Sequence, residues 1–301
     1  MTRRSAPPPA PPRSLAPVWL VMGKGGVGKT TIAAGLAALE AETHGQAVLV
    51  ELGDGESGKR ALAGARKGVE HIVIRPADAL EKAATPLFGS ATIAKLVLNN
   101  FAMKPLLRAA PAIRELAALE VVRQIAGERP GVRVIVDMPA TGHGVAWLRV
   151  PRQGRDFLGS GPLFDLCERL GEELIAPGKA SILVVTLPER LVIEETLELC
   201  AALERETGLG AERIVVNRMP EAFPDGALAS AQALAAEGGP LAAHAAALAE
   251  ALAARAIQRE ESLAAIEILA RHEHHVFRVP LAPVDPAARD VARWLRAEGA
   301  G

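Results

Sequence analysis

One glycine-rich loop constrains the fold of this chain more than any other stretch, and it reads GKGGVGKTT over residues 23–31. An apolar run, VWLVM (18–22), precedes it, and an alanine-rich stretch of helical character follows it. The order G-x-x-x-x-G-K-[ST] between a strand and a helix is the pattern of a phosphate-binding loop. Glycines let backbone N–H groups converge on an anion without Cβ clashes, and the following helix points its positive end there. The sequence therefore predicts a strand–loop–helix unit that binds ATP.

Individual residues of the loop have separate expected roles. Lys29 can reach the β- and γ-phosphates, and the Thr30 hydroxyl can ligate Mg²⁺. The helix is expected to begin at about Val27. The alternative is a plain glycine turn, which the complete pattern in this context disfavours. The predicted nucleotide-binding residues of the loop are Gly23, Lys24, Gly25, Gly26, Val27, Gly28, Lys29, Thr30 and Thr31.

Six further runs have the length and composition of strands. They are continuously apolar rather than alternating, which is typical of strands that are covered on both faces of a parallel sheet. Helix-length segments separate them, so successive strands should be joined by crossovers. We predict an α/β fold with a doubly wound, mostly parallel sheet of the P-loop NTPase type. The runs are 47–52, 71–75, 132–137, 181–187, 213–217 and 275–280.

The chain divides into a tail and one domain. Residues 1–17 are proline-rich and are expected to be disordered. Residues 18–298 are expected to form a single P-loop ATPase domain with two helical additions. One is a helical insertion at about 78–127, and the other is an alanine-rich block at about 226–272, broken near Gly238-Gly239-Pro240.

Composition excludes several classes of function. The formal net charge of −1 over 301 residues leaves no basic footprint, so no nucleic-acid partner is expected. Only Cys167 and Cys200 are cysteines, without a CxxC pattern, which favours a cytoplasmic chain. The apolar run 18–22 is too short for a signal peptide, and no integral membrane segment is expected. The run RHEHH (271–275) could bind a metal, but a solvated helix end is favoured.

The second lysine of the loop points to a family. KGGVGKTT resembles the deviant Walker A motif of the ATPase class that contains the arsenite-pump ATPases, the tail-anchored-protein targeting ATPase, the partition and cell-division-site ATPases and the nitrogenase iron protein. In that class the early lysine crosses a dimer interface to the partner's nucleotide. The resemblance implies a homodimer in which Lys24 stabilises transition-state charge in trans, as an arginine finger does. The alternative for Lys24 is a solvated surface lysine.

A second segment resembles switch II of the arsenite-pump and targeting branch. VIVDMPATGHGVAWLRVP (134–151) has a strand that ends in Asp137, followed by the turn Thr141-Gly142-His143. The resemblance implies that Asp137 holds Mg²⁺, through a water, and that the turn senses the γ-phosphate. The family's Ala-Pro is reversed here to Pro139-Ala140. A cap or turn role stays open for Asp137, and a structural role for His143.

Switch I departs further from the family pattern. LVELGDGESGKRALAG (49–64) takes its place, and counting along the strand puts Asp54 at the position of the water-orienting aspartate, with Glu51 or Glu56 as fallback. The family's proline and histidine are absent, so a solvated acidic loop is the alternative. VTLPERLVIEETLEL (185–199) resembles the family's T-x-P-E segment, which leads into a helix with a Glu-Thr. It is interpreted as a strand, a proline and an amphipathic helix without a catalytic role.

Two later segments resemble the nucleobase site of the family. IVVNRMP (214–220) ends a strand in Asn217, whose amide can pair with a purine edge. FRVPLAPVDPA (277–287) resembles the loop that closes over the base, around Pro280 and Leu281. The alternative for Asn217 is a turn-forming role after the strand.

The resemblance covers about residues 18–295 and implies a Mg-ATP-dependent homodimeric ATPase switch. Hydrolysis would be coupled to binding or release of a protein or membrane-protein partner. A partition-type positioning ATPase and a regulatory subunit with little hydrolysis are the alternatives. Two cysteines are too few for an arsenite site or a zinc-pinned dimer. Residues 85–110 are apolar and could form a client groove or a dimer surface, although internal packing is slightly favoured.

Overall fold

The computed structural model describes residues 16–65, 67–88, 90, 92, 111–272 and 275–299. The tail expected over 1–17 and the apolar region 85–110 lie largely outside these residues.

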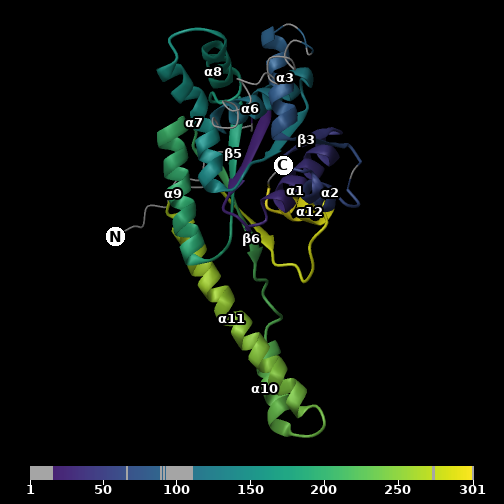
Figure 1. Ribbon diagram of the computed structural model, residues 1–301. Helices are drawn as coiled ribbons and strands as arrows, with labels where there is room; N and C mark the ends of the chain where they lie inside the picture. The colour runs from purple at the N-terminus through teal and green to yellow at the C-terminus, as the bar shows by residue number, and fades with distance from the viewer. Residues whose placement is uncertain are drawn as a thin grey trace, which may run out of the picture.

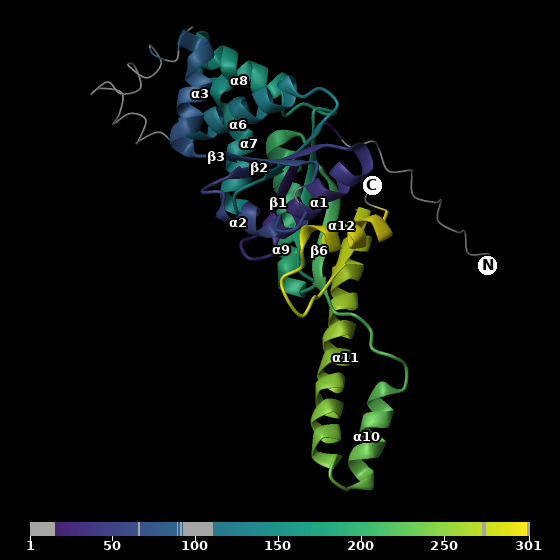
Figure 2. The same ribbon diagram turned by 90° about the vertical axis from the view of Figure 1, so that its right-hand side faces the viewer.

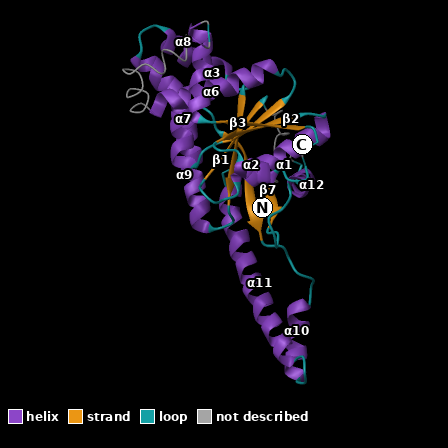
Figure 3. Cartoon of the chain, turned by 45° about the vertical axis from the view of Figure 1, so that its right-hand side comes forward, coloured by secondary structure: helices purple, strands orange, loops and turns teal. Residues whose placement is uncertain are grey.

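The strands of the described chain join one sheet, and every pairing in it is parallel (Figure 3). This confirms the predicted α/β class. The order across the sheet is β3-β2-β4-β1-β5-β6-β7. Each strand lies on one of the predicted apolar runs. The strands are β1 (Val18–Gly23), β2 (Ala47–Leu52), β3 (Val69–Ile74), β4 (Arg133–Asp137), β5 (Ala180–Thr186), β6 (Ala211–Met219) and β7 (His275–Pro280).

Helices connect the strands and cover the sheet on both faces (Figure 1). Their bounds are α1 (Lys29–His44), α2 (Glu56–Ala61), α3 (Pro76–Phe88), α6 (Pro111–Glu128), α7 (Thr141–Phe157), α8 (Pro162–Glu173), α9 (Arg190–Thr207), α10 (Ala227–Glu237), α11 (Ala242–Ala270) and α12 (Ala288–Ala297). The helices α6, α7, α8 and α9 and the end of α11 contribute to one core, and α1 and α12 to the other.

The strand β1 shows why its sequence is apolar throughout. Successive side chains of a strand point to opposite faces. Leu20 and Met22 therefore enter the core under α6–α9, whereas Trp19 and Val21 enter the core under α1 and α12. Because both faces are buried, neither set of positions tolerates polar residues. The same burial of both faces explains why apolar and polar residues do not alternate along the other central strands.

The strand order brings several chain segments together at one edge of the sheet. The central strand is β1, with β4 on one side and β5 on the other. In open parallel sheets, ligands bind beyond the carboxyl ends of the strands, at the point where the order reverses. The loop 23–31 follows β1 at this edge, and Asp137 ends β4 in register with Val21. The fold thus predicts a ligand site at the glycine loop.

The helices α10 and α11 form a hairpin that projects away from the sheet (Figures 1 and 2). The chain enters it after β6, and the break between its helices lies where the sequence has Gly238-Gly239-Pro240. Ala245 and Ala249 are buried in the outer part of α11, whereas Ile266 and Leu269 are buried in the core beside the sheet. One continuous helix therefore joins the arm to the core. Among the described residues, no helix is long and apolar enough to span a bilayer.

Candidate functional site

Two glycines of the loop 23–31 occupy positions that exclude any side chain. Gly23 has φ +147°, and a Cβ there would lie 2.3 Å from the Val185 carbonyl oxygen. Gly28 has φ +92°, and a Cβ there would lie 2.3 Å from Asn217 Nδ2. The left-handed Gly28 is the N-cap of α1, which begins at Lys29. The helix thus starts two residues later than the predicted start at about Val27, because the backbone turns at Gly28 first.

Lys29 folds inward across the loop. Its Nζ donates a hydrogen bond to the Lys24 carbonyl oxygen at 3.0 Å. Burial lowers the pKa of the Lys29 ammonium, and the nearby charge of Asp137 partly opposes this shift. A half-buried ammonium inside a turn of glycine N–H groups attracts an anion strongly, since little water screens it. Thr31 is half-buried behind it in α1, while Gly25 and Gly26 are exposed.

Thr30 and Asp137 form the acidic side of the site. The Thr30 hydroxyl donates a hydrogen bond to Asp137 Oδ2 at 2.6 Å. The other oxygen, Asp137 Oδ1, is buried without a hydrogen-bond partner among the described residues. Burial raises the pKa of Asp137 to about 6, with Glu51 also raising it, whereas the Thr30 hydrogen bond and the Lys29 charge lower it. An unsatisfied buried carboxylate oxygen beside a hydroxyl fits Mg²⁺, which prefers oxygen ligands.

The switch I carboxylates divide between the interior and the surface. Glu51 is buried and lies in register with Asp137. Its carboxylate accepts a hydrogen bond from the Gly58 N–H at 2.9 Å and pairs with His71 Nε2 at 3.0 Å. Asp54 is exposed, and its Oδ1 accepts the Glu56 N–H at 3.0 Å at the start of α2. Orientation of water by Asp54 stays a prediction. The sequence analysis gives Glu51 only as an alternative to Asp54 for orienting water, and it assigns no role to His71.

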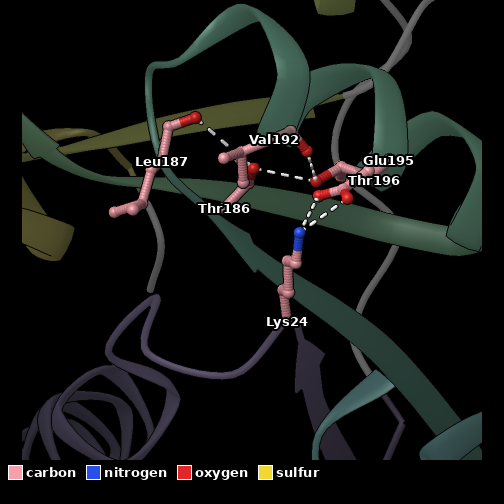
Figure 4. A network of polar contacts seen from close by, with 6 residues as sticks. All are labelled: Lys24, Thr186, Leu187, Val192, Glu195 and Thr196. Atoms are coloured by element: carbon pink, nitrogen blue, oxygen red, sulfur yellow. Dashed lines mark hydrogen bonds and ion pairs between the residues drawn. The ribbon is translucent and has the colours of Figure 1, made fainter. Parts of the chain in front are cut away.

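Lys24 lies on the exposed rim of the loop and points away from it. Its Nζ contacts both carboxylate oxygens of Glu195 on α9, at 2.6 and 2.5 Å (Figure 4). The next residue, Thr196, is buried, and its hydroxyl donates to the Val192 carbonyl oxygen at 2.7 Å. It also shares a hydrogen bond of 2.8 Å with the Thr186 hydroxyl. Sequence analysis assigns no catalytic role to this part of α9, although Glu195-Thr196 is the Glu-Thr pair by which this helix resembles the family.

Asn217 joins the end of β6 to the loop. Its Nδ2 donates to the Val27 carbonyl oxygen at 2.8 Å, and its Oδ1 accepts the Arg218 N–H at 2.9 Å. Among the described residues, Arg218 is the non-glycine residue with positive φ, at +59°. The Asn217 amide therefore supports the loop backbone, and a contact with a nucleobase stays a prediction.

The predicted base loop borders an open cavity. Leu281 donates its N–H to the Met219 carbonyl oxygen at 2.8 Å, which ties the end of β7 to the end of β6, and Pro280 is in register with Met219. Leu281 lines a cavity of about 680 Å³ together with Leu187, Arg218 and residues of α11. The role of Pro280 and Leu281 in binding a base stays a prediction.

For the remaining candidate residues, the described structure shows no contact that indicates binding or catalysis. Thr141-Gly142-His143 form the first turn of α7, but their side chains lie outside the described residues. Part of the run 271–275 also lies outside, and no group of three metal-binding side chains occurs in the described part of the chain. Cys167 and Cys200 are buried and free, and burial raises the pKa of both thiols, that of Cys200 to about 11. Such thiols are poor metal ligands near neutral pH.

Comparison with known protein families identifies the class of this domain. Residues 18–241 match the model of the CobQ/CobB/MinD/ParA nucleotide binding domain. The chain belongs to this family. Members of the family are P-loop nucleotide-binding domains, so the predicted class of protein is confirmed. The matched part contains the glycine loop, Asp137 and Asn217, and it ends just before α11. No curated protein matches the chain.

Proposed function

We propose that this member of the family is a Mg²⁺-dependent ATPase switch of the arsenite-pump and targeting type. It acts as a homodimer and couples ATP hydrolysis to binding or release of a protein or membrane-protein partner. The observation that supports this most is the contact of Thr30 with Asp137, because it leaves Asp137 Oδ1 buried and unsatisfied beside Lys29. We also place the protein in the cytoplasm, which the free cysteines favour.

The residues of the site divide the binding of Mg-ATP among them. The loop N–H groups and Lys29 would hold the phosphates, and Thr30 and Asp137 would hold Mg²⁺, Thr30 through its hydroxyl and Asp137 through its carboxylate. When bound, Mg²⁺ neutralises charge on the β- and γ-phosphate oxygens. The positive end of α1 faces the same phosphates and adds to their attraction.

A second subunit is needed because Lys24 does not serve its own loop. The inward position is taken by Lys29, whose Nζ bonds to the Lys24 backbone. The Lys24 side chain is half exposed on the rim, where a second loop can approach it. Its ammonium would then stabilise the charge that develops on the partner's γ-phosphate. Asp54 is the candidate for orienting the attacking water, with Glu51 in reserve.

A regulatory subunit with little hydrolysis is the second candidate, and one observation favours it. The Asp54 carboxylate is occupied by the Glu56 N–H, and Glu51 is occupied by Gly58 and His71. A carboxylate that is committed to other donors orients water poorly. A partition-type or positioning ATPase is a third candidate, since the matched family includes domains of that type.

Turnover and nucleotide binding test these candidates together. Wild type should bind ATP only with Mg²⁺ and hydrolyse it, and Lys29→Ala should lose both properties. Lys24→Ala and Asp54→Asn should bind ATP normally but hydrolyse it at least about tenfold more slowly, since each removes a group that acts on the transition state. Arg190→Ala on the exposed side of α9 is a matched control that should retain turnover. Binding without hydrolysis in the wild type would favour the regulatory subunit, and absence of Mg-dependent ATP binding would refute the proposal.

A further inference from the structure

The ion pair between Lys24 and Glu195 joins two distant parts of the chain. Lys24 lies in the loop after β1, and Glu195 lies on α9, 171 residues later. The ammonium contacts both oxygens of the carboxylate, and the side chains are 50% and 38% exposed. Both partners therefore meet solvent, and each can be reached by a second molecule. A charge-assisted contact to both oxygens is stronger than a single hydrogen bond between neutral groups.

Contacts within the subunit hold the backbone at both ends of this pair. The backbone of Lys24 is held by the Nζ of Lys29. Glu195 is flanked on α9 by the buried Ile193 and Thr196, and Thr196 is tied to the end of β5 through Thr186 (Figure 4). The side chains are therefore the parts that can move, whereas the loop and the helix stay in place.

Space for such a movement lies next to the pair. A cavity of about 420 Å³ between α7 and α9 is lined by Lys24 and Glu195 and by Val145 and Arg149 of α7. This helix begins four residues after Asp137, so the cavity wall continues into the predicted switch II. The Lys24 side chain can leave Glu195 without displacing any part of the backbone core.

We propose that Glu195 is a positioning residue that holds Lys24 within its own subunit until a second, ATP-loaded subunit takes the lysine over. This proposal rests on the proposed function, in which Lys24 acts across a dimer. One ammonium cannot pair closely with Glu195 and with the partner's phosphate together. A γ-phosphate carries more negative charge than a carboxylate, so ATP competes for Lys24 where ADP, which lacks that group, does not. Glu195 thereby makes dimer closure depend on the γ-phosphate.

The expected effect follows from the strength of exposed ion pairs. Such a pair favours the paired state by about 1.5- to 5-fold. A symmetric dimer releases two of these pairs, one in each subunit. Removing the carboxylate should therefore lower the dimer dissociation constant in Mg-ATP by about 2- to 25-fold. Because salt screens exposed charges, the gain should shrink as ionic strength rises.

Glu195→Gln in the full chain tests this exchange. The dimer dissociation constant is measured by analytical ultracentrifugation in Mg-ATPγS and in Mg-ADP, at low and at high salt. We expect tighter dimers for Glu195→Gln in ATPγS at low salt and no change in ADP. Glu194→Gln is the matched control, because Glu194 is a neighbouring carboxylate that pairs with Arg190 of its own helix, at 3.0 Å. The double variant Lys24→Ala/Glu195→Gln should dimerise like Lys24→Ala alone.

The outcomes separate this exchange from the proposed function. If wild type dimerises with ATPγS and Glu195→Gln dimerises equally or more weakly, the positioning role of Glu195 is overturned while the ATPase switch stands. A gain that persists in the Lys24→Ala background overturns it as well, because Glu195 then acts through another group. If wild type binds ATPγS but stays monomeric, or does not bind it, the homodimeric switch fails together with the exchange.

Discussion

Replacing Asp137 should change how the stability of the nucleotide-free protein depends on pH. Burial raises the pKa of this carboxyl from 3.8 to about 6. The folded protein therefore binds the proton more tightly than the unfolded chain does, and stability falls as pH rises through the window between these values. At about 1.4 kcal/mol per pH unit, the full effect is about 3 kcal/mol. Asp137→Asn cannot titrate, so this part of the pH dependence should disappear.

The difference in unfolding free energy between wild type and Asp137→Asn removes the contribution of every titrating group that does not interact with Asp137, and leaves that of Asp137 with its neighbours Lys29 and Glu51. Denaturant unfolding of both proteins between pH 4 and pH 7.5, without nucleotide or metal, should show wild type losing up to about 3 kcal/mol relative to Asp137→Asn as pH rises. Saturating Mg-ATP should reduce the loss in wild type, because the ionised carboxylate gains a partner. A difference that stays constant over this range would refute the interpretation of Asp137 Oδ1 as a buried, uncompensated charge.

Two further predictions concern the backbone of the loop. Gly28→Ala should lower ATP affinity at least about tenfold and stability by about 1–2 kcal/mol, measured by calorimetry and denaturation, because φ is +92° and the new Cβ meets Asn217. Gly26→Ala is the control, because Gly26 also has a positive φ, +83°, but no atom lies within 4 Å of an added Cβ. It should show only the loss of stability that comes from the strained backbone conformation. Asn217→Ala should weaken ATP and GTP binding equally if Asn217 only supports Val27, whereas a loss confined to ATP would show that it reads the base.

The sequence predicts the strands and the loop well because each depends on local chemistry. Strands buried on both faces must be apolar throughout, and a phosphate loop requires glycines at fixed spacing. The family resemblance includes the Glu-Thr of α9, but no local pattern predicts that Glu195 contacts Lys24. Glu194, Glu195 and Glu198 lie on the same helix, and only the packing of α9 beside the loop selects one of them. A turn-forming role of Asn217 is an alternative that the sequence offers, but its support of Val27, 190 residues earlier, depends on the packing of β6 beside the loop.

The charges at the sheet edge explain why a single subunit is a poor catalyst in this proposal. Strand register sets Glu51 beside Asp137, so two carboxylates lie close to one another at this edge, while the Lys29 ammonium turns into the loop. A triphosphate adds further negative charge that these residues do not balance. Mg²⁺ held by Thr30 and Asp137 would supply part of the missing positive charge. Lys24 lies on the exposed rim of the loop, where Glu195 holds its ammonium. In the proposed homodimer, hydrolysis would therefore wait for the second subunit, because Lys24 stays paired with Glu195 until the two subunits meet.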